Sequence, residues 1–220
     1  KQKTAYEIYQ CDWSSDVCSS DLSARVRFVA GMLNIQLDVI NIAYDDESTT
    51  TNIIGAKQVP LLIKDDGEAM AESLDIINYF LELASSNESS QPSAPVLDWQ
   101  KQAFLPLQKV GYPRWSNMTL PEFATETAKQ AWRAKKETEA LNFEALINDT
   151  PAIAKEVAAL IEQTKSLLNL SSEKQTSLVD QAIIFSILRG FFSAPEVQWD
   201  PAVLHWMATA RKATNVPVLI

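Results

Sequence analysis

Hydrophobic and polar residues follow different periods along the first third of the chain. The apolar positions of residues 22–33 fall on one helical face and predict an amphipathic helix: Leu22, Val26, Val29 and Leu33. Residues 36–42 alternate polar and apolar side chains, which predicts a half-buried strand. Residues 45–55 are polar and can hold a short helix that ends at Gly55.

A hairpin and another helix are predicted next. Residues 59–64 form a short apolar strand that begins at a proline, and residues 65–67, Asp-Asp-Gly, offer a tight turn before residues 68–70. Ser73 is predicted to cap a helix that runs to about Leu83. From residue 22 the predicted order is helix, strand, helix, strand, strand, helix.

The rest of the chain has a helical pattern throughout. We expect helices over residues 97–109, 121–148, 151–170 and 201–214, three of which begin at a proline. This indicates an all-α region in the second half of the chain. The basic residues at the end of the second of these helices, within a Glu-rich stretch, are predicted to lie on a solvated face: Arg133, Lys135 and Lys136.

A capping box introduces one further helix. Ser177 is expected to accept a hydrogen bond from the backbone N–H of Asp180, whose carboxylate would reach back to Ser177. The following residues 182–188 are apolar all round, which predicts a buried helix. Core packing also explains best the tryptophans spread over this half of the chain: Trp99, Trp115, Trp132, Trp199 and Trp206.

Charge and composition divide the chain in two. Residues 1–85 carry 6 Lys and Arg against 14 Asp and Glu, a net charge of −8, whereas residues 86–220 carry 13 against 14, a net charge of −1. Residues 84–95 are polar, rich in serine and end in prolines, as linkers do. We therefore predict an α/β domain over residues 1–85, a linker over 86–96 and an all-α domain over 97–220.

The overall composition excludes several classes of function. The 220 residues are 46% hydrophobic and 21% charged, as in globular proteins, and the net charge of −9 argues against binding to nucleic acid or to an anionic membrane. We expect a cytoplasmic protein, because no signal pattern or apolar membrane span is present. We also expect it to be a monomer. With His205 as the only histidine, and with Cys11 and Cys18 separated by six residues, we expect no metal site.

Two short motifs resemble the thioredoxin-like domain of glutaredoxins and glutathione transferases. They are Gln58-Val59-Pro60 at the start of the third strand and Glu72-Ser73 at the start of the next helix. The resemblance implies that the Val59–Pro60 bond is cis and that Val59 pairs with glutathione as an added strand. It also implies that Glu72 and Ser73 receive the γ-glutamyl end of glutathione.

Longer segments are most similar to the glutaredoxin 2 family, the two-domain bacterial glutaredoxins built like glutathione transferases. These segments are 23–27, 55–60, 64–66 and 71–76, and the likeness extends over about residues 22–220. It implies a thioredoxin-like domain followed by a helical domain. It also implies a glutathione-dependent thiol–disulfide oxidoreductase, with glutathione as co-substrate and glutathionylated or disulfide-containing proteins as partners.

The chain departs from that family at the redox motif. The family has Cys-Pro-Tyr-Cys immediately before the first helix, where this chain has Cys18-Ser19-Ser20-Asp21. Cys18 takes the place of the attacking cysteine, and Asp21 takes the place of the resolving one. A carboxylate cannot attack a mixed disulfide, so only a one-thiol mechanism would remain for Cys18.

The segment around this motif has an unusual sequence. It repeats Ser-Ser-Asp and reads like a translated sequencing-library adapter, so we interpret residues 11–22 as an artefact that replaced the native first strand and dithiol. Residues 4–10 alternate well enough to serve as a substitute strand. Two alternatives to an oxidoreductase remain: a glutathione transferase, and a catalytically silent protein that binds glutathione or docks a partner. The native motif would distinguish them.

Overall fold

The chain contains a four-stranded sheet in its first part. The computed structural model describes residues 5–9, 19–173 and 175–220, so Cys11 and Cys18 lie outside the described residues. The strands are β1 (Ala5–Tyr9), β2 (Leu37–Asn41), β3 (Leu61–Ile63) and β4 (Ala69–Met70). Their spatial order is β2-β1-β3-β4, with β1 parallel to β2 and antiparallel to β3, and β3 antiparallel to β4. The predicted strand over residues 4–10 is therefore confirmed.

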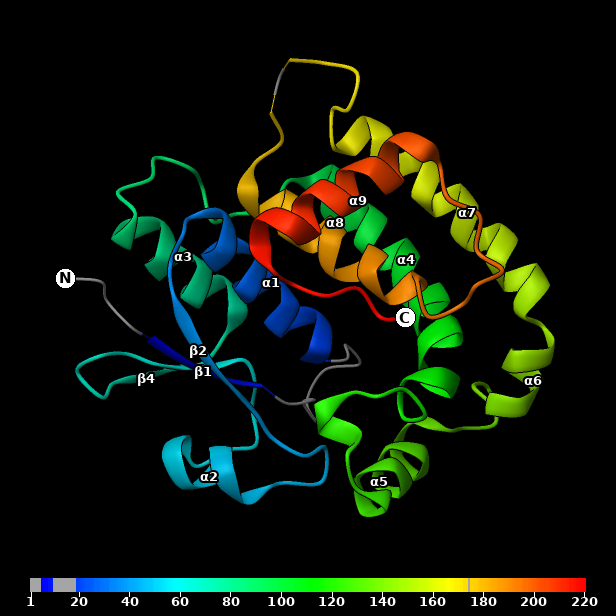
Figure 1. Ribbon diagram of the computed structural model, residues 1–220, viewed down its shortest axis with the longest axis horizontal. Helices are drawn as coiled ribbons and strands as arrows, with labels where there is room; N and C mark the ends of the chain where they lie inside the picture. Colours follow the sequence, from blue (N-terminus) through cyan, green and yellow to red (C-terminus); the bar gives the residue numbers. More distant parts are fainter. Residues whose placement is uncertain (1–4, 10–18, 174) are drawn as a thin grey trace.

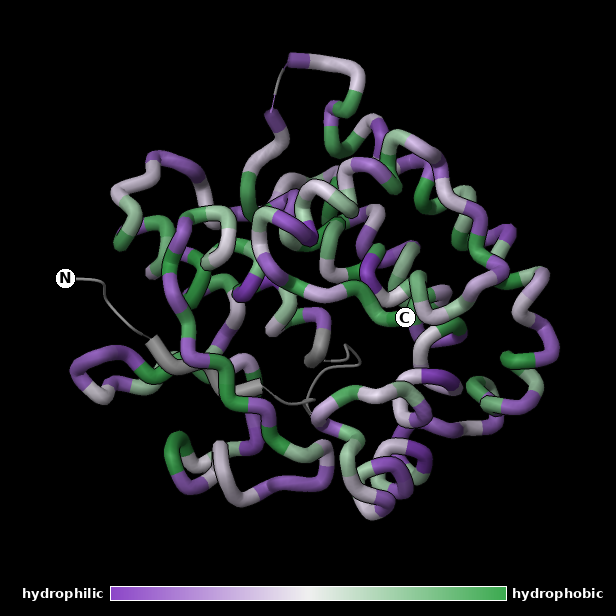
Figure 2. Tube along the Cα trace, in the orientation of Figure 1, coloured by the Kyte–Doolittle hydropathy of each residue, from purple (hydrophilic) through white to green (hydrophobic). Residues whose placement is uncertain are grey.

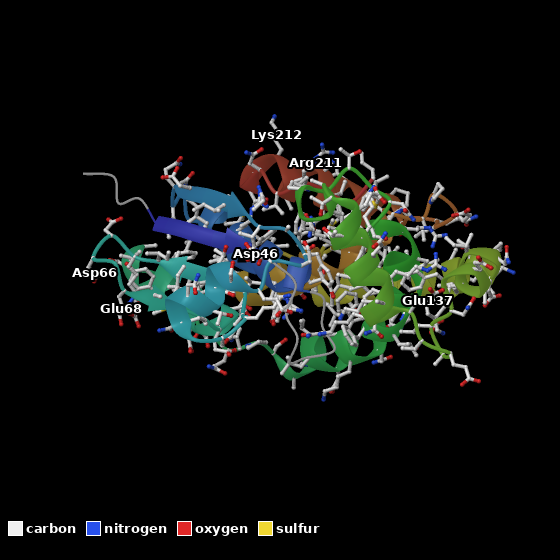
Figure 3. All side chains as sticks on the ribbon, turned by 90° about the horizontal axis from the view of Figure 1, so that it is seen from below. Asp46, Asp66, Glu68, Glu137, Arg211 and Lys212 are labelled. Carbon is white, nitrogen blue, oxygen red and sulfur yellow. The ribbon has the colours of Figure 1, made fainter. Side chains whose placement is uncertain are left out.

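Three helices accompany the sheet: α1 (Ser19–Met32), α2 (Ser48–Ile54) and α3 (Ser73–Leu83). Gly55 ends α2 with a φ of 75°, and its N–H donates to Thr51 O at 2.8 Å. At the hairpin turn, Gly67 has a φ of 87° and donates to Lys64 O at 2.9 Å. Asp66 and Glu68 lie together on this exposed turn (Figure 3), where the Glu68 N–H donates to Asp66 Oδ1 at 2.9 Å.

The second part of the chain is helical. Its elements are α4 (Ala94–Trp115), a short 3-10 turn η1 (Pro121–Phe123), α5 (Glu126–Lys136), α6 (Phe143–Asn148), α7 (Thr150–Leu167), α8 (Leu178–Phe191) and α9 (Pro201–Thr214). Figure 1 shows α8 and α9 beside α1, with α5 and α6 at the periphery. The tube in Figure 2 is largely hydrophilic along α5. Nearly every residue of α8 is buried, as its apolar sequence predicts.

The predicted helix over residues 121–148 is wrong. Three shorter elements replace it, because Thr125 accepts from Ala128 N to start α5 and Asn142 accepts from Ala145 N to start α6. The helix predicted over 97–109 is longer than expected and continues through Pro106 and Pro113 to Trp115. Both prolines are buried, and packing of α4 against α7 and α8 outweighs their local preference to interrupt a helix.

One predicted helix cap is wrong, and another is confirmed only in part. Ser73 is the first residue of α3 rather than its cap, and Glu72, with a φ of 70°, is the N-cap. Ser177 does accept from Asp180 N, at 3.3 Å, as predicted. The Asp180 carboxylate, however, accepts from the backbone N–H of Ser93 at 2.8 Å, so it holds the segment before α4 against α8.

The hydrophobic core is continuous from the first part of the chain to the second. Phe28 on α1 and Phe185 on α8 pack with ring centroids 4.9 Å apart, and Arg25 Nε donates to Ser186 Oγ at 3.0 Å. Helix α1 is buried on most sides because α3 covers one side and α8 and α9 cover another. The boundary at residues 86–96 stays a prediction, since the core extends across it. None of the described helices is long and apolar enough to span a bilayer.

Candidate glutathione site at the start of strand β3 and helix α3

Val59 and Pro60 lie in the segment that connects α2 to β3. Their peptide bond is cis, as the resemblance implies. The Val59 side chain is 2% exposed and packs with Ile42, which follows β2, and with Leu61 on β3. The position of Val59 at the beginning of β3 is therefore held by apolar contacts with one residue just after β2 and one on β3.

Glu72 and Ser73 lie where β4 leads into α3. In the first turn of a helix the N–H groups have no partner within the helix, and they form a favourable place for a carboxylate. Ser73 is 8% exposed, and its N–H belongs to this first turn. Glu72 has a left-handed backbone conformation with a φ of 70° at the N-cap.

A single hydrogen bond connects the two motifs. Gln58 Nε2 donates to Glu72 Oε1 at 2.5 Å, between a residue next to Val59 and a residue next to Ser73. The structure thus brings together Val59, Pro60, Glu72 and Ser73. No role for Gln58 was predicted from the sequence, although its place directly before Val59-Pro60 was a usable signal.

Lys57 directly precedes Gln58, and its contacts lead from the proposed site toward the helical part of the chain. Its ammonium donates to Tyr44 O at 3.2 Å, lies 5.7 Å from the centre of the Tyr44 ring and is 3.6 Å from a Glu47 carboxylate oxygen. The Tyr44 backbone N–H donates to Glu122 O at 2.9 Å. The Tyr44 ring contacts Trp132 of α5, with centroids 5.2 Å apart. Sequence reasoning did not single out Lys57 or Tyr44.

Asp21 lies in the first turn of α1, in the interior of the protein. It is 0% exposed, and neither carboxylate oxygen has a hydrogen-bond partner among the described residues. Burial raises the pKa of Asp21 from 3.8 to about 7, although the charges of Arg189 and Arg25 lower it. Burial likewise lowers the pKa of Arg25 to about 10. A carboxylate is therefore poorly accommodated at this position.

The predicted site residues thus fall into two groups. The glutathione-binding candidates form one connected arrangement at the start of β3 and of α3. The redox candidate Cys18 lies outside the described residues, and Asp21 faces two buried arginines. No cluster of metal-ligating side chains is found within the described ranges.

Comparison with known proteins identifies the relatives of this chain. The family model for the C-terminal domain of glutaredoxin 2 matches residues 95–220, more than half of the chain. The chain belongs to the glutaredoxin 2 family. The model for the N-terminal domain of glutathione S-transferases matches residues 15–89. Glutaredoxin 2 of Escherichia coli is 28% identical over 206 residues, which cover 93% of this chain and 95% of the relative.

Solved structures show the same fold. Glutaredoxin 2 from Salmonella typhimurium in complex with glutathione superposes with a TM-score of 0.85 at 23% identity, covering 98% of this chain and 96% of the other. A glutathione S-transferase of Ceriporiopsis subvermispora in complex with glutathione has a TM-score of 0.67 at 13% identity, covering 97% and 98%. The fold is that of glutathione transferases, with a thioredoxin-like first domain and a helical second domain.

Proposed function

We propose that this chain binds glutathione through Val59, Pro60, Glu72 and Ser73 and uses it in thiol–disulfide exchange. As a member of the glutaredoxin 2 family, the chain belongs to the class of glutathione-dependent thiol–disulfide oxidoreductases. The observation that carries the proposed site is the hydrogen bond from Gln58 to Glu72, which holds the two motifs together in one arrangement.

Each binding residue has a separate physical role. The backbone of Val59, at the start of β3, would pair with the tripeptide as an added strand. The N–H of Ser73 at the start of α3 would receive the α-carboxylate of the γ-glutamyl end. The Glu72 carboxylate, oriented by Gln58, would receive the adjacent α-ammonium group.

Cys18 would support a one-thiol reaction. Its thiolate attacks the glutathione sulfur of a glutathionylated protein, the S–S bond breaks, and the protein thiol leaves with a proton from solvent. A second glutathione thiolate then attacks the mixed disulfide on Cys18, which releases glutathione disulfide and regenerates the Cys18 thiolate. Asp21 has no sulfur and cannot provide the intramolecular release that a second cysteine would.

Glutathione binding provides a direct test. Calorimetric titration of the full chain should detect glutathione, and Glu72→Gln should weaken its binding by about tenfold, because a charge-assisted contact to the ammonium is lost. Asp75→Asn is the matched control: Asp75 also lies in the first turn of α3, outside the proposed contacts. Equal binding by the unchanged chain and the Glu72→Gln variant would exclude this site.

Glutathione transfer to an electrophile is the second candidate function. It is favoured by the match of residues 15–89 to the transferase N-terminal domain model. The helical part also has a hollow of about 530 Å³ between α4, α5 and α6, but none of the four proposed glutathione contacts lines it. Conjugation of glutathione to a chlorinated nitrobenzene, measured beside disulfide reduction, distinguishes the two activities.

We also propose that the protein acts as a cytoplasmic monomer on glutathionylated or disulfide-containing proteins. The net charge of −9 supports a protein that stays apart from anionic membranes and nucleic acids. Light scattering of the purified chain tests the monomer, and fractionation of expressing cells tests the location.

A further inference from the structure

Lys136, the last residue of α5, is a largely buried residue whose ammonium lies against two aromatic rings. Lys136 as a whole residue is 9% exposed. The ammonium lies 5.3 Å from the centre of the Tyr112 ring and 5.8 Å from that of Trp132. Within the part of the chain that the structure describes, no carboxylate lies within ion-pair distance of Lys136, in contrast to the prediction of a solvated face.

The other cations of α5 contrast with Lys136. Lys129 pairs with Glu126 at 2.6 Å, and Arg133 donates twice to Glu137, at 2.5 and 3.1 Å. Glu137 directly follows Lys136 and is labelled on the α5 side of Figure 3, but both of its oxygens are taken by Arg133 and one of them also accepts from Phe143 N. The carboxylate nearest in sequence is therefore not the partner of Lys136.

The aromatic contacts satisfy only part of the bonding capacity of this ammonium. A lysine ammonium has three donors and is seldom buried without a paired anion. Cation–π contacts stabilise the charge but accept none of those donors in conventional hydrogen bonds. The described residues thus leave Lys136 able to bind an anion that they do not themselves supply.

The position of Lys136 relates this cation to the proposed glutathione site. The Trp132 ring contacts both the Lys136 ammonium and the Tyr44 ring. The centroids of the Trp132 and Tyr44 rings lie 5.2 Å apart. Tyr44 in turn lies beneath the Lys57 ammonium, and Lys57 precedes the Gln58 that binds Glu72. A continuous set of contacts therefore leads from Glu72 to Lys136, and Figure 1 shows α2 and α5 at the same end of the molecule.

We propose that Lys136 binds a carboxylate on the molecule that is joined through sulfur to glutathione. The proposal rests on the proposed glutathione site. It specifies the chemical class of the group that is bonded to the glutathione sulfur: that group carries a carboxylate. The chain carries a net charge of −9 and repels anionic partners in general, so a cation linked to the site through Trp132 and Tyr44 would select an acidic substituent by position. The carboxylate can come from a second glutathione or from an acidic residue beside the cysteine of a protein substrate.

Two stable glutathione thioethers test the proposal without any exchange reaction. S-carboxyethyl-glutathione carries the carboxylate, and S-hydroxyethyl-glutathione has a hydroxyl in its place. In calorimetric titrations of the full chain we expect the acidic thioether to bind about tenfold more tightly than the neutral one. Lys136→Met should abolish that preference, and Lys136→Arg should retain it.

Lys129→Met is the matched control, since Lys129 lies on the same helix and already pairs with Glu126. It should leave the preference unchanged. Equal binding of the two thioethers by the unchanged chain would overturn the proposal, as would an equal loss of both in Lys136→Met, which would indicate a structural role. Failure of the glutathione site itself is seen separately, as absent binding of glutathione alone.

The source of the carboxylate follows from two further titrations. Glutathione disulfide supplies a second glutathione, and a glutathionylated peptide with Glu beside its cysteine supplies a protein-like acid, with the Gln peptide as its control. The source is the ligand whose binding weakens in Lys136→Met. If neither binding weakens, the proposal is wrong.

Discussion

Gln58 donates its side-chain amide to the Glu72 carboxylate, with 2.5 Å between Nε2 and Oε1. This contact places the residue before Val59-Pro60 beside the N-cap of α3. It orients a carboxylate that would otherwise be free to turn toward solvent. Gln58 is thus a positioning residue for the proposed glutathione site.

Removing this donor should weaken glutathione binding. We expect Gln58→Leu to lower the affinity by about tenfold, because the Glu72 carboxylate loses the hydrogen bond that orients it. Titration calorimetry measures the effect. Gln102→Leu, at an exposed position on α4 whose amide donates to Asp98 O, is the control and should bind glutathione like the unchanged chain. If Gln58→Leu also binds normally, the contact has no positioning role.

Asp21 should make the protein less stable at neutral pH than at mild acidity. Its pKa in the folded protein, about 7, is higher than the ordinary value of 3.8, so the folded state holds a proton that the unfolded state releases between these pH values. Stability therefore falls as pH rises from about 4 to about 7 and stays low above that. Urea unfolding measured across this range tests the expectation.

Asp21→Asn tests whether this carboxylate causes the loss of stability. It should stabilise the protein at pH 8 by up to about 4 kcal/mol and have little effect near pH 4, because an amide carries no buried charge. Asp65→Asn, on the exposed hairpin turn, is the control and should not change the pH profile. A profile that is the same with and without Asp21 would show that this carboxylate is not buried.

Restoring the family motif should increase disulfide reduction. With Cys-Pro-Tyr-Cys at positions 18–21, a second thiol can release the mixed disulfide within the molecule, whereas Asp21 cannot. A glutathione-coupled reduction assay compares the two proteins, with Cys18→Ser as the blank. Equal rates would contradict our interpretation of Asp21 and of residues 11–22.

Gly31 is expected to be required for the contact between α1 and α9. A Cβ added at Gly31 would lie 2.6 Å from the Thr214 Cα and 2.7 Å from its carbonyl oxygen, which are backbone atoms that cannot rotate away. Alanine favours a helix by about 1 kcal/mol over glycine, but overpacking costs about 1–3 kcal/mol. Gly31→Ala should therefore lower the free energy of unfolding, while Met32→Ala, at an exposed position, should change it little. Greater stability of Gly31→Ala would contradict this close approach.

Local signals in the sequence predicted much of the fold. Gly55 ends α2, Gly67 turns the β3–β4 hairpin, and Ser177 caps α8, because each depends on hydrogen bonds between residues close in the chain. The motifs that carry the family resemblance also lie within short segments. For these reasons the fold and the candidate residues Val59, Pro60, Glu72 and Ser73 could be recognised before the structure was known.

Tertiary packing decided where local rules did not apply. Helix α4 continues through Pro106 and Pro113 because its packing against α7 and α8 stabilises it, although each proline removes a hydrogen bond. Asp180, expected to cap its own helix, instead binds the Ser93 N–H. In both cases the deciding partner lies far away in the sequence.

The same distinction applies to the charged residues. The sequence by itself determined the family and the motifs at the proposed site, because these depend on residue identity at fixed spacing. Only the tertiary structure placed Lys136 beneath Tyr112 and Trp132, and only it buried Asp21 near Arg189. The energy of a charge depends on its exposure to water and on nearby charges, and both are set by elements that come together only when the chain folds.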